Sequence, residues 1–286
     1  MDDSTNLDRR TALKLVGSAA GVGSAAALGG SKTTTARATT GSGPVGDATY
    51  AIEKAKADLA FQTSVKKHYI RQLKSRGDCQ ASYSTTESSG ETFCGDSPES
   101  VYLGQDESLD PDYGDKYESD DTDSYQDAEL KAEYDLGSDT IEAYAWDDAG
   151  YGTFIAWAYI GAEFEIKDSS GQQDATITFT PDVTADMGTF GECGNGATLE
   201  GWVEDHTDNE KYDETVFDYT DHSRRWSSSY TDSVNMTLEA GHTYSAVMKI
   251  TASTTCEANA GSGVSDFTEE DDGSQKVDVG NIQIKF

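Results

Sequence analysis

The sequence is poor in basic residues, with 21 lysines and arginines against 53 aspartates and glutamates and a net charge of -32. Nucleic-acid binding needs a basic surface that neutralises phosphates, so this charge argues against a DNA- or RNA-binding protein. Disorder does not follow, because 15 tyrosines, 9 phenylalanines and 4 tryptophans supply apolar surface for a packed core. We expect a folded protein with an acidic surface, which stays hydrated and dispersed in concentrated salt.

Sequence motifs for catalysis are also missing. The chain has no G-x-S-x-G nucleophile elbow, no H-E-x-x-H helix and no P-loop. A glycosidase needs two carboxylates across a cleft, and 53 acidic residues do not single out a pair. We therefore expect a protein without catalytic activity, with a polysaccharide hydrolase as the alternative.

Long apolar runs are limited to residues 15–28, a stretch too short and too rich in alanine and glycine to span a bilayer comfortably. Arg9 and Arg10 stand shortly before it, and an A-x-A sequence at residues 36–38 offers a cleavage site. This arrangement resembles a twin-arginine signal peptide. We assign residues 1–38 to the signal and expect no transmembrane segment after it. The alternative is a basic stub before a transmembrane helix.

The signal and the acidic bias together resemble the exported proteins of halophilic archaea. The resemblance covers only the signal and the composition, and it identifies no functional family. It implies a protein that is secreted, or held at the surface of a cell adapted to high salt. In that group the twin-arginine route is general, so the signal implies no bound cofactor.

Residues 39–49 predict a linker, and residues 50–76, which lack glycine and proline, predict one helix. At 100° per residue, six apolar side chains fall on one broad face: Ile52, Ala55, Leu59, Tyr69, Ile70 and Leu73. The opposite face gathers Lys56, Lys67, Arg71 and Lys74. We expect the helix to pack on the rest of the domain. Binding of its basic face to anionic lipid, or to the acidic surface of another copy, is the alternative.

Residues 77–137 predict a loop-rich acidic segment. Residues 106–127 contain ten acidic residues and one lysine, but no D-x-[DN]-x-[DN]-G spacing occurs. We therefore expect a solvated loop there and no bound cofactor, with calcium as the cation to test.

From Ser138 the hydrophobic pattern has a period of two, which predicts β-strands. The longest alternating run covers residues 154–166, and further strands are expected at 140–146, 175–179, 199–203, 215–219, 234–238, 244–252, 277–279 and 282–286. About eight strands with intervening Gly/Asp/Ser turns predict a mainly β fold, an antiparallel, jelly-roll-like β-sandwich over residues 138–286. Residues 238–244 predict a hairpin turn.

Aromatic residues allow two interpretations. Tyr144 and Trp146 share one face of a predicted strand, and Trp157 and Tyr159 share one face of the next. If the alanine-rich faces are buried, these four rings form an exposed platform for sugars. If the rings are buried, they form the core, which large rings fill better than alanines do.

Four cysteines in an exported chain predict disulfides, and we favour Cys79–Cys94 with Cys193–Cys256. No C-x-x-C pair is present, so we expect no zinc site. Asn235 begins the N-x-[ST] sequon of the chain and alternates away from its apolar neighbours, so we expect it to face solvent and accept a glycan.

Histidines stand beside carboxylates in residues 204–208 and 218–222, and two such loops would offer ligands to a metal ion. Aspartate is so frequent here that we attribute both neighbours to chance and expect no metal. We expect an exported binding or structural module without catalysis, with polysaccharide or further copies of itself as partners. A polysaccharide hydrolase and a self-assembling surface or filament subunit are the alternatives.

Overall fold

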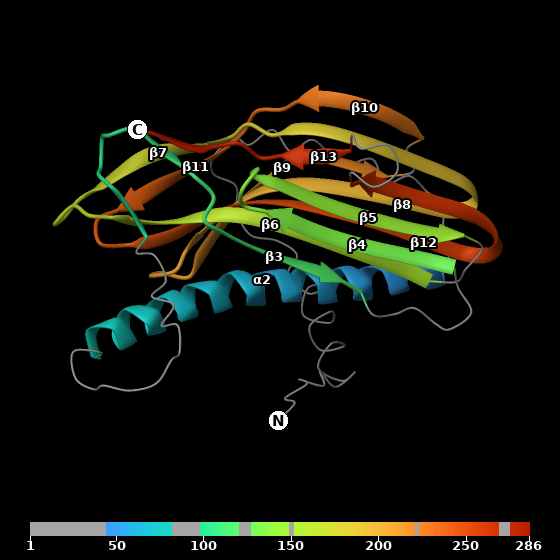
Figure 1. The fold of residues 1–286 in the computed structure, drawn as a ribbon, viewed down its shortest axis with the longest axis horizontal. Coiled ribbons are helices and arrows are strands. Elements are labelled where there is room, and N and C mark those ends of the chain that lie inside the picture. Colours follow the sequence, from blue (N-terminus) through green and yellow to red (C-terminus); the bar gives the residue numbers. More distant parts are fainter. Residues whose placement is uncertain (1–43, 82–97, 120–126, 149–151, 221–222, 269–274) are drawn as a thin grey trace, which may run out of the picture.

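The computed structural model describes residues 44–81, 98–119, 127–148, 152–220, 223–268 and 275–286. These residues form one long helix, α2 (Pro44–Ala81), and fourteen strands in two sheets (Figure 1). The predicted signal with Arg9 and Arg10 lies outside them. Among the described residues we find no helix with the length and apolar character that a bilayer span requires.

The larger sheet has ten strands, and all but one of its pairings are antiparallel. Its strands are β1 (Glu99–Val101), β3 (Tyr113–Glu118), β4 (Asp127–Asp135), β5 (Thr140–Asp148), β6 (Gly152–Ile166), β8 (Asp182–Asp205), β9 (Glu210–Thr220), β10 (Arg224–Ser229), β12 (Thr243–Phe267) and β13 (Lys276–Asp278). The smaller sheet pairs β11 (Asp232–Glu239), β7 (Gln172–Phe179), β14 (Ile282–Lys285) and β2 (Glu107–Leu109) in that order. Inward side chains of both sheets share one hydrophobic core, which confirms the predicted β-sandwich.

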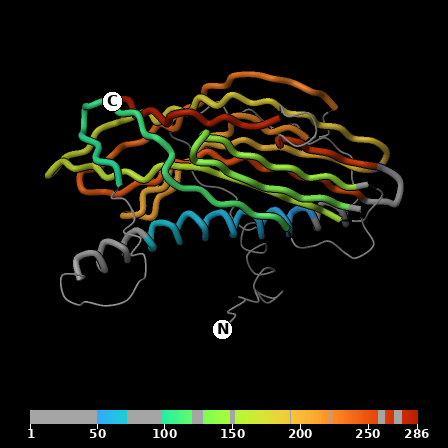
Figure 2. The backbone as a smooth tube through the Cα atoms, viewed as in Figure 1, coloured from blue at the N-terminus to red at the C-terminus, as the bar shows by residue number. Residues whose placement is uncertain are grey.

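Strands β8 and β12 pair along most of their lengths, and both run along the long axis of the molecule (Figure 2). The register shifts between Cys256 and Gly261. On one side of this shift, β6 pairs with β12 and β9 pairs with β8. On the other side, β5 pairs with β12, and β13 and β10 pair with β8. Cys193 lies directly opposite Cys256, and the two form a disulfide, as predicted. Of the other predicted pair, Cys79–Cys94, the Cys79 side chain and Cys94 lie outside the described part of the chain.

Strand β6 is buried on both faces, so its aromatic residues belong to a core although its alanine-rich face is buried as well. Its alanine-rich face, with Ala156 and Ala158, lines the same core as Ala143 and Ala145 of β5. Small side chains on both strands allow close packing there. Its opposite face carries aromatic side chains, and helix α2 covers that face.

The helix packs on the sheet, but through a different face from the one the sequence pattern indicated. Its buried face carries Ala57, Phe61 and Val65, whereas Ile52 and Leu59 of the expected face are 39% and 36% exposed. The two faces lie about 140° apart around the axis. Phe61 decides the docking, because its ring fits among the rings of three aromatic residues on the sheet: Trp157, Tyr159 and Trp202. The helix is also longer than residues 50–76.

The predicted loop-rich segment, residues 77–137, is also corrected. Strands β1 and β3 pair with β6, β4 pairs with β5, and β2 joins the smaller sheet. β1, β2 and β3 are short and β4 has nine residues, and each of the four strands places at least one apolar side chain in a core; examples are Val101, Leu109, Tyr113 and Ala132. In the short strands, one inward residue among solvated polar residues gives little alternation in the sequence, which is why the pattern did not predict them. Because these strands belong to the two sheets, the sandwich begins well before residue 138.

The predicted hairpin at residues 238–244 is wrong in one respect. The turn is present, with the His242 N–H donating to the Glu239 carbonyl at 3.2 Å and Gly241 at a φ of 79°. Such a positive φ at the third turn position favours glycine. Strands β11 and β12 nevertheless belong to different sheets, so the turn links the two layers of the sandwich.

Candidate functional site

The structure separates the four predicted platform residues into two pairs. Trp157 and Tyr159 are 2% and 1% exposed beneath α2. The indole N–H of Trp157 donates to the Ala57 carbonyl at 3.0 Å, and the Tyr159 hydroxyl lies 2.8 Å from Ser64 Oγ. Ser64 also donates to Asp115. These two rings therefore belong to the core between the helix and the sheet, and they cannot form an exposed platform.

Tyr144 and Trp146 of β5 also face away from the alanine-lined core. They alternate with Ala143 and Ala145, which are completely buried, and each is itself half-buried. In the register, Lys131 of β4 and Asp266 of β12 lie opposite Tyr144. Glu129 of β4 and Val264 of β12 lie opposite Trp146. The outward face of β5 thus holds two aromatic rings beside charged groups, a composition suited to a polar ligand with apolar faces.

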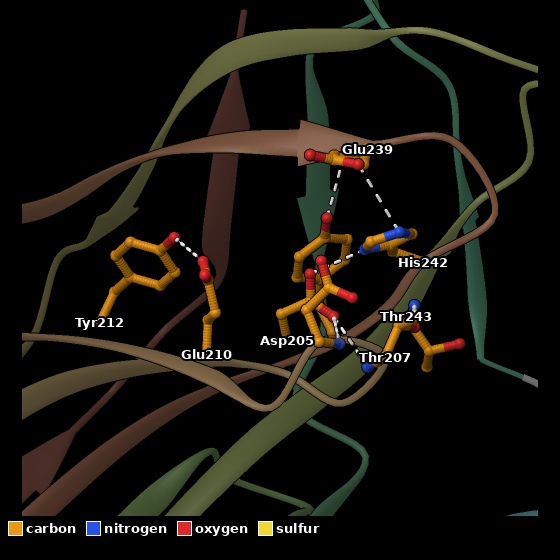
Figure 3. Close-up of polar contacts among 9 residues, drawn as sticks. Asp205, Thr207, Glu210, Tyr212, Glu239, His242 and Thr243 are labelled. Carbon is orange, nitrogen blue, oxygen red and sulfur yellow. Dashed lines mark hydrogen bonds and ion pairs between the residues drawn. The ribbon is translucent and has the colours of Figure 1, made fainter.

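A second candidate site lies where two turns meet at one end of the sandwich (Figure 3). Asp205 ends β8, Asp208 lies in the turn to β9, and His242 lies in the turn between β11 and β12. Asp205 Oδ1 accepts hydrogen bonds from the backbone N–H groups of Thr207 and Asp208, at 2.8 and 3.2 Å. Asp205 is therefore held rigidly at the base of its turn.

Two hydrogen bonds join the two turns. The His206 N–H donates to the Thr243 carbonyl at 3.0 Å, and the Thr243 N–H donates to Thr207 Oγ1 at 3.3 Å. His242 extends this junction, with Nδ1 2.8 Å from Asp205 Oδ2 and Nε2 3.7 Å from Glu239 Oε2 (Figure 3). The imidazole therefore lies between two carboxylates from different strands.

Carboxylates dominate the electrostatics of His242. Burial lowers the pKa of this histidine, but the hydrogen bond to Asp205 and the negative charges of Asp205, Asp208 and Glu239 together raise it. One atom each from Asp205, Asp208 and His242 also lies within 4.8 Å of the others, which is the arrangement of a potential metal site.

The sequence pointed to this turn but to the wrong histidine. We considered residues 204–208 beside residues 218–222, whereas the structure brings Asp205 and Asp208 to His242; His222 lies outside the described residues. His206 turns to the helix side, where its ring stacks on Tyr69 at 4.1 Å and its Nε2 lies 2.6 Å from Ser245 Oγ. The turn at Gly241 was visible in the sequence, but its position beside residue 205 depends on the packing of the two sheets.

Histidines also anchor the helix. His68 stacks on Tyr113 with ring centroids 3.8 Å apart, near the stacked pair of Tyr69 and His206. Burial lowers the pKa of both His68 and His206 to about 4, so both rings are neutral at physiological pH. This cluster fixes the helix on the sheet.

Asn235 is exposed on β11, at one edge of the smaller sheet, and its side-chain oxygen accepts a hydrogen bond from Thr176 Oγ1 at 2.9 Å. Glycosylation of Asn235 stays a prediction. In comparisons with known proteins, the chain matches no protein-family model and no curated protein sequence.

Proposed function

We propose that this chain is an exported binding module of a salt-adapted cell, without catalysis, and that its ligand is a polysaccharide. The observation that carries the proposal is the pair Tyr144 and Trp146 on the outward face of β5. Export and salt adaptation rest on the twin-arginine-like signal and the net charge of -32.

The spacing of the two rings suits a chain of linked sugars. Residues two apart on one strand face lie about 7 Å from each other, so a single extended glycan can contact both. Aromatic rings pack against the apolar faces of sugar rings, while carboxylates and ammonium groups bond their hydroxyls. Glu142 lies on the same strand face, and its carboxylate is 3.7 Å from the Lys131 ammonium, so both kinds of polar group are present.

Aromatic stacking on a neutral ligand suits a module that works in concentrated salt. Apolar stacking strengthens in salting-out media, whereas ion pairs between exposed groups are screened. A ligand held mainly by two rings and neutral hydroxyls therefore keeps its affinity where a charged ligand would lose it.

A binding screen in molar salt tests the proposal. The exported chain would be applied to a glycan array and to insoluble polysaccharides, and released reducing sugar would be measured alongside. Trp146→Ala should weaken binding about ten-fold or more through the lost stacking. Tyr102→Ala is the matched control, because Tyr102 is an exposed aromatic residue away from β5.

Equal binding by both variants would assign the ligand to another surface. Failure to bind any glycan would overturn the choice of polysaccharide. Release of reducing sugar would replace the binding module with a hydrolase.

A further inference from the structure

We propose that Asp205, Asp208 and His242 form a binding site for a divalent transition-metal cation, with Glu239 beside it. The site lies in turns at the end of the sandwich and is independent of the polysaccharide proposal. It uses side chains from two chain segments that come together only in the folded protein.

Distances within the cluster are close to those between ligands of one ion. Two ligands that each lie about 2.1 Å from a metal are about 3 to 4 Å apart. The 2.8 Å between Asp205 Oδ2 and His242 Nδ1 is close to the lower end of that range, and all three ligand atoms lie within 4.8 Å of one another. Asp208 is exposed in its turn, so a small side-chain rotation brings its carboxylate into coordination.

Two of the three donors, Asp205 and His242, are held in place before an ion arrives. Asp205 is only 6% exposed, and two backbone N–H groups fix its Oδ1, so its Oδ2 has a defined direction. The bonds between the turns at residues 206–207 and Thr243 fix the position of His242 relative to Asp205. A preformed site costs little ordering entropy on binding.

The charge of the cluster favours a cation. Three carboxylates, from Asp205, Asp208 and Glu239, act on one imidazole. A divalent ion between Asp205 and His242 would displace the proton that now joins them and would neutralise more of this charge than that proton does.

The donor set selects the class of ion. Calcium takes six to eight oxygen ligands, whereas an imidazole nitrogen favours ions such as Zn²⁺. One nitrogen with two carboxylates corresponds to a three-residue transition-metal site completed by water. We therefore name Zn²⁺ as the probe and Ca²⁺ as the contrasting ion.

Equilibrium dialysis and calorimetry on the chelator-treated, full exported chain in molar salt test the site. We expect one saturable Zn²⁺ per chain and a higher unfolding midpoint in its presence. Asp208→Asn should weaken Zn²⁺ binding about ten-fold or more and leave the metal-free unfolding midpoint unchanged, because Asp208 is exposed. Asp213→Asn, an exposed acid on β9, is the matched control and should bind like the unchanged chain.

Three results would overturn the inference. One is the absence of saturable binding, and another is equal loss in the Asp208 and Asp213 variants, which would mean diffuse attraction to an acidic surface. The third is tighter binding of Ca²⁺ than of Zn²⁺, which would refute the transition-metal assignment. His242→Gln gives a second reading, since loss of Zn²⁺ binding with an intact fold would place the ion on the imidazole.

Discussion

The partly buried His68 makes the junction between helix and sheet sensitive to pH. His68 is enclosed by Tyr113 and by Glu163, whose Oε2 is 3.9 Å from His68 Nε2, and Arg71 lies on the same helix. Burial, with a smaller effect of the Arg71 charge, lowers the pKa of His68 to about 4. His68 is therefore protonated near pH 6.5 in the unfolded chain, but only near pH 4 in the folded chain.

The sign of the pH effect follows from that difference. A lowered histidine pKa gives stability that is complete above about pH 6.5 and is lost as the pH falls toward 4. We expect His68 to account for about 1–3 kcal/mol of that loss. Urea unfolding from pH 7 to 4.5 measures it, and His68→Gln should flatten the slope. An identical slope in the variant would refute the assignment.

Glycines in β6 and β8 allow close packing that larger residues would prevent. A Cβ on Gly161 would lie 2.5 Å from the Ala246 carbonyl oxygen, which is backbone and cannot move aside. A Cβ on Gly188 would meet only Val264 Cγ1, at 3.1 Å. We expect Gly161→Ala to destabilise the fold by about 1–3 kcal/mol and Gly188→Ala by less. Chemical denaturation of both variants checks the order, and equal effects would count against it.

At the scale of elements, the docking of α2 depends on Phe61. Its ring meets Trp157, Tyr159 and Trp202 edge-on, with centroids 4.9 to 5.8 Å apart. Phe61→Ala should cost about 3–5 kcal/mol, because it removes a fully buried ring. Leu59→Ala, on the exposed face of the same helix, should stay within about 0.5 kcal/mol.

Thermal unfolding of these two helix variants separates the two possible faces. A larger loss from Leu59→Ala than from Phe61→Ala would restore the face that the sequence pattern indicated. The sequence pattern indicated that face because it carries more apolar residues. The other face is buried because the Phe61 ring packs among three aromatic rings, which stabilises the docking more than several aliphatic side chains would.

At the scale of the whole molecule, net charge sets the dependence on salt. With a charge of -32, carboxylate repulsion opposes the compact state, and salt screens that repulsion. We expect the unfolding midpoint to rise between dilute buffer and molar potassium chloride. An unchanged midpoint would contradict the proposed adaptation to salt, and a matched sodium chloride series controls for the identity of the cation.

The disulfide also acts on the whole molecule, because Cys193 and Cys256 are 63 residues apart. Removing it should cost about 2–4 kcal/mol through the greater freedom of the unfolded chain. The double variant Cys193→Ser with Cys256→Ser, compared with the unchanged chain by urea unfolding, measures this. A loss below about 0.5 kcal/mol would show that the pairing of β8 with β12 holds this region without the disulfide.

The sequence by itself determined the acidic surface, the helix, the Cys193–Cys256 pair and the strands from β5 onward, except for β10, residues 182–198 of β8 and residues 253–267 of β12. Each of these depends on local alternation, on composition or on residue type. A run such as residues 154–166 specifies a strand regardless of its partners, and an even number of cysteines favours disulfides.

Only the tertiary structure decided which faces are buried and which residues meet. The burial of Trp157 needs α2 above it, β1 and β3 need β6 as a template, and His242 reaches Asp205 because two sheets place their turns side by side. These contacts join residues far apart in the chain, and their free energy depends on shape and distance in three dimensions, which no local pattern encodes.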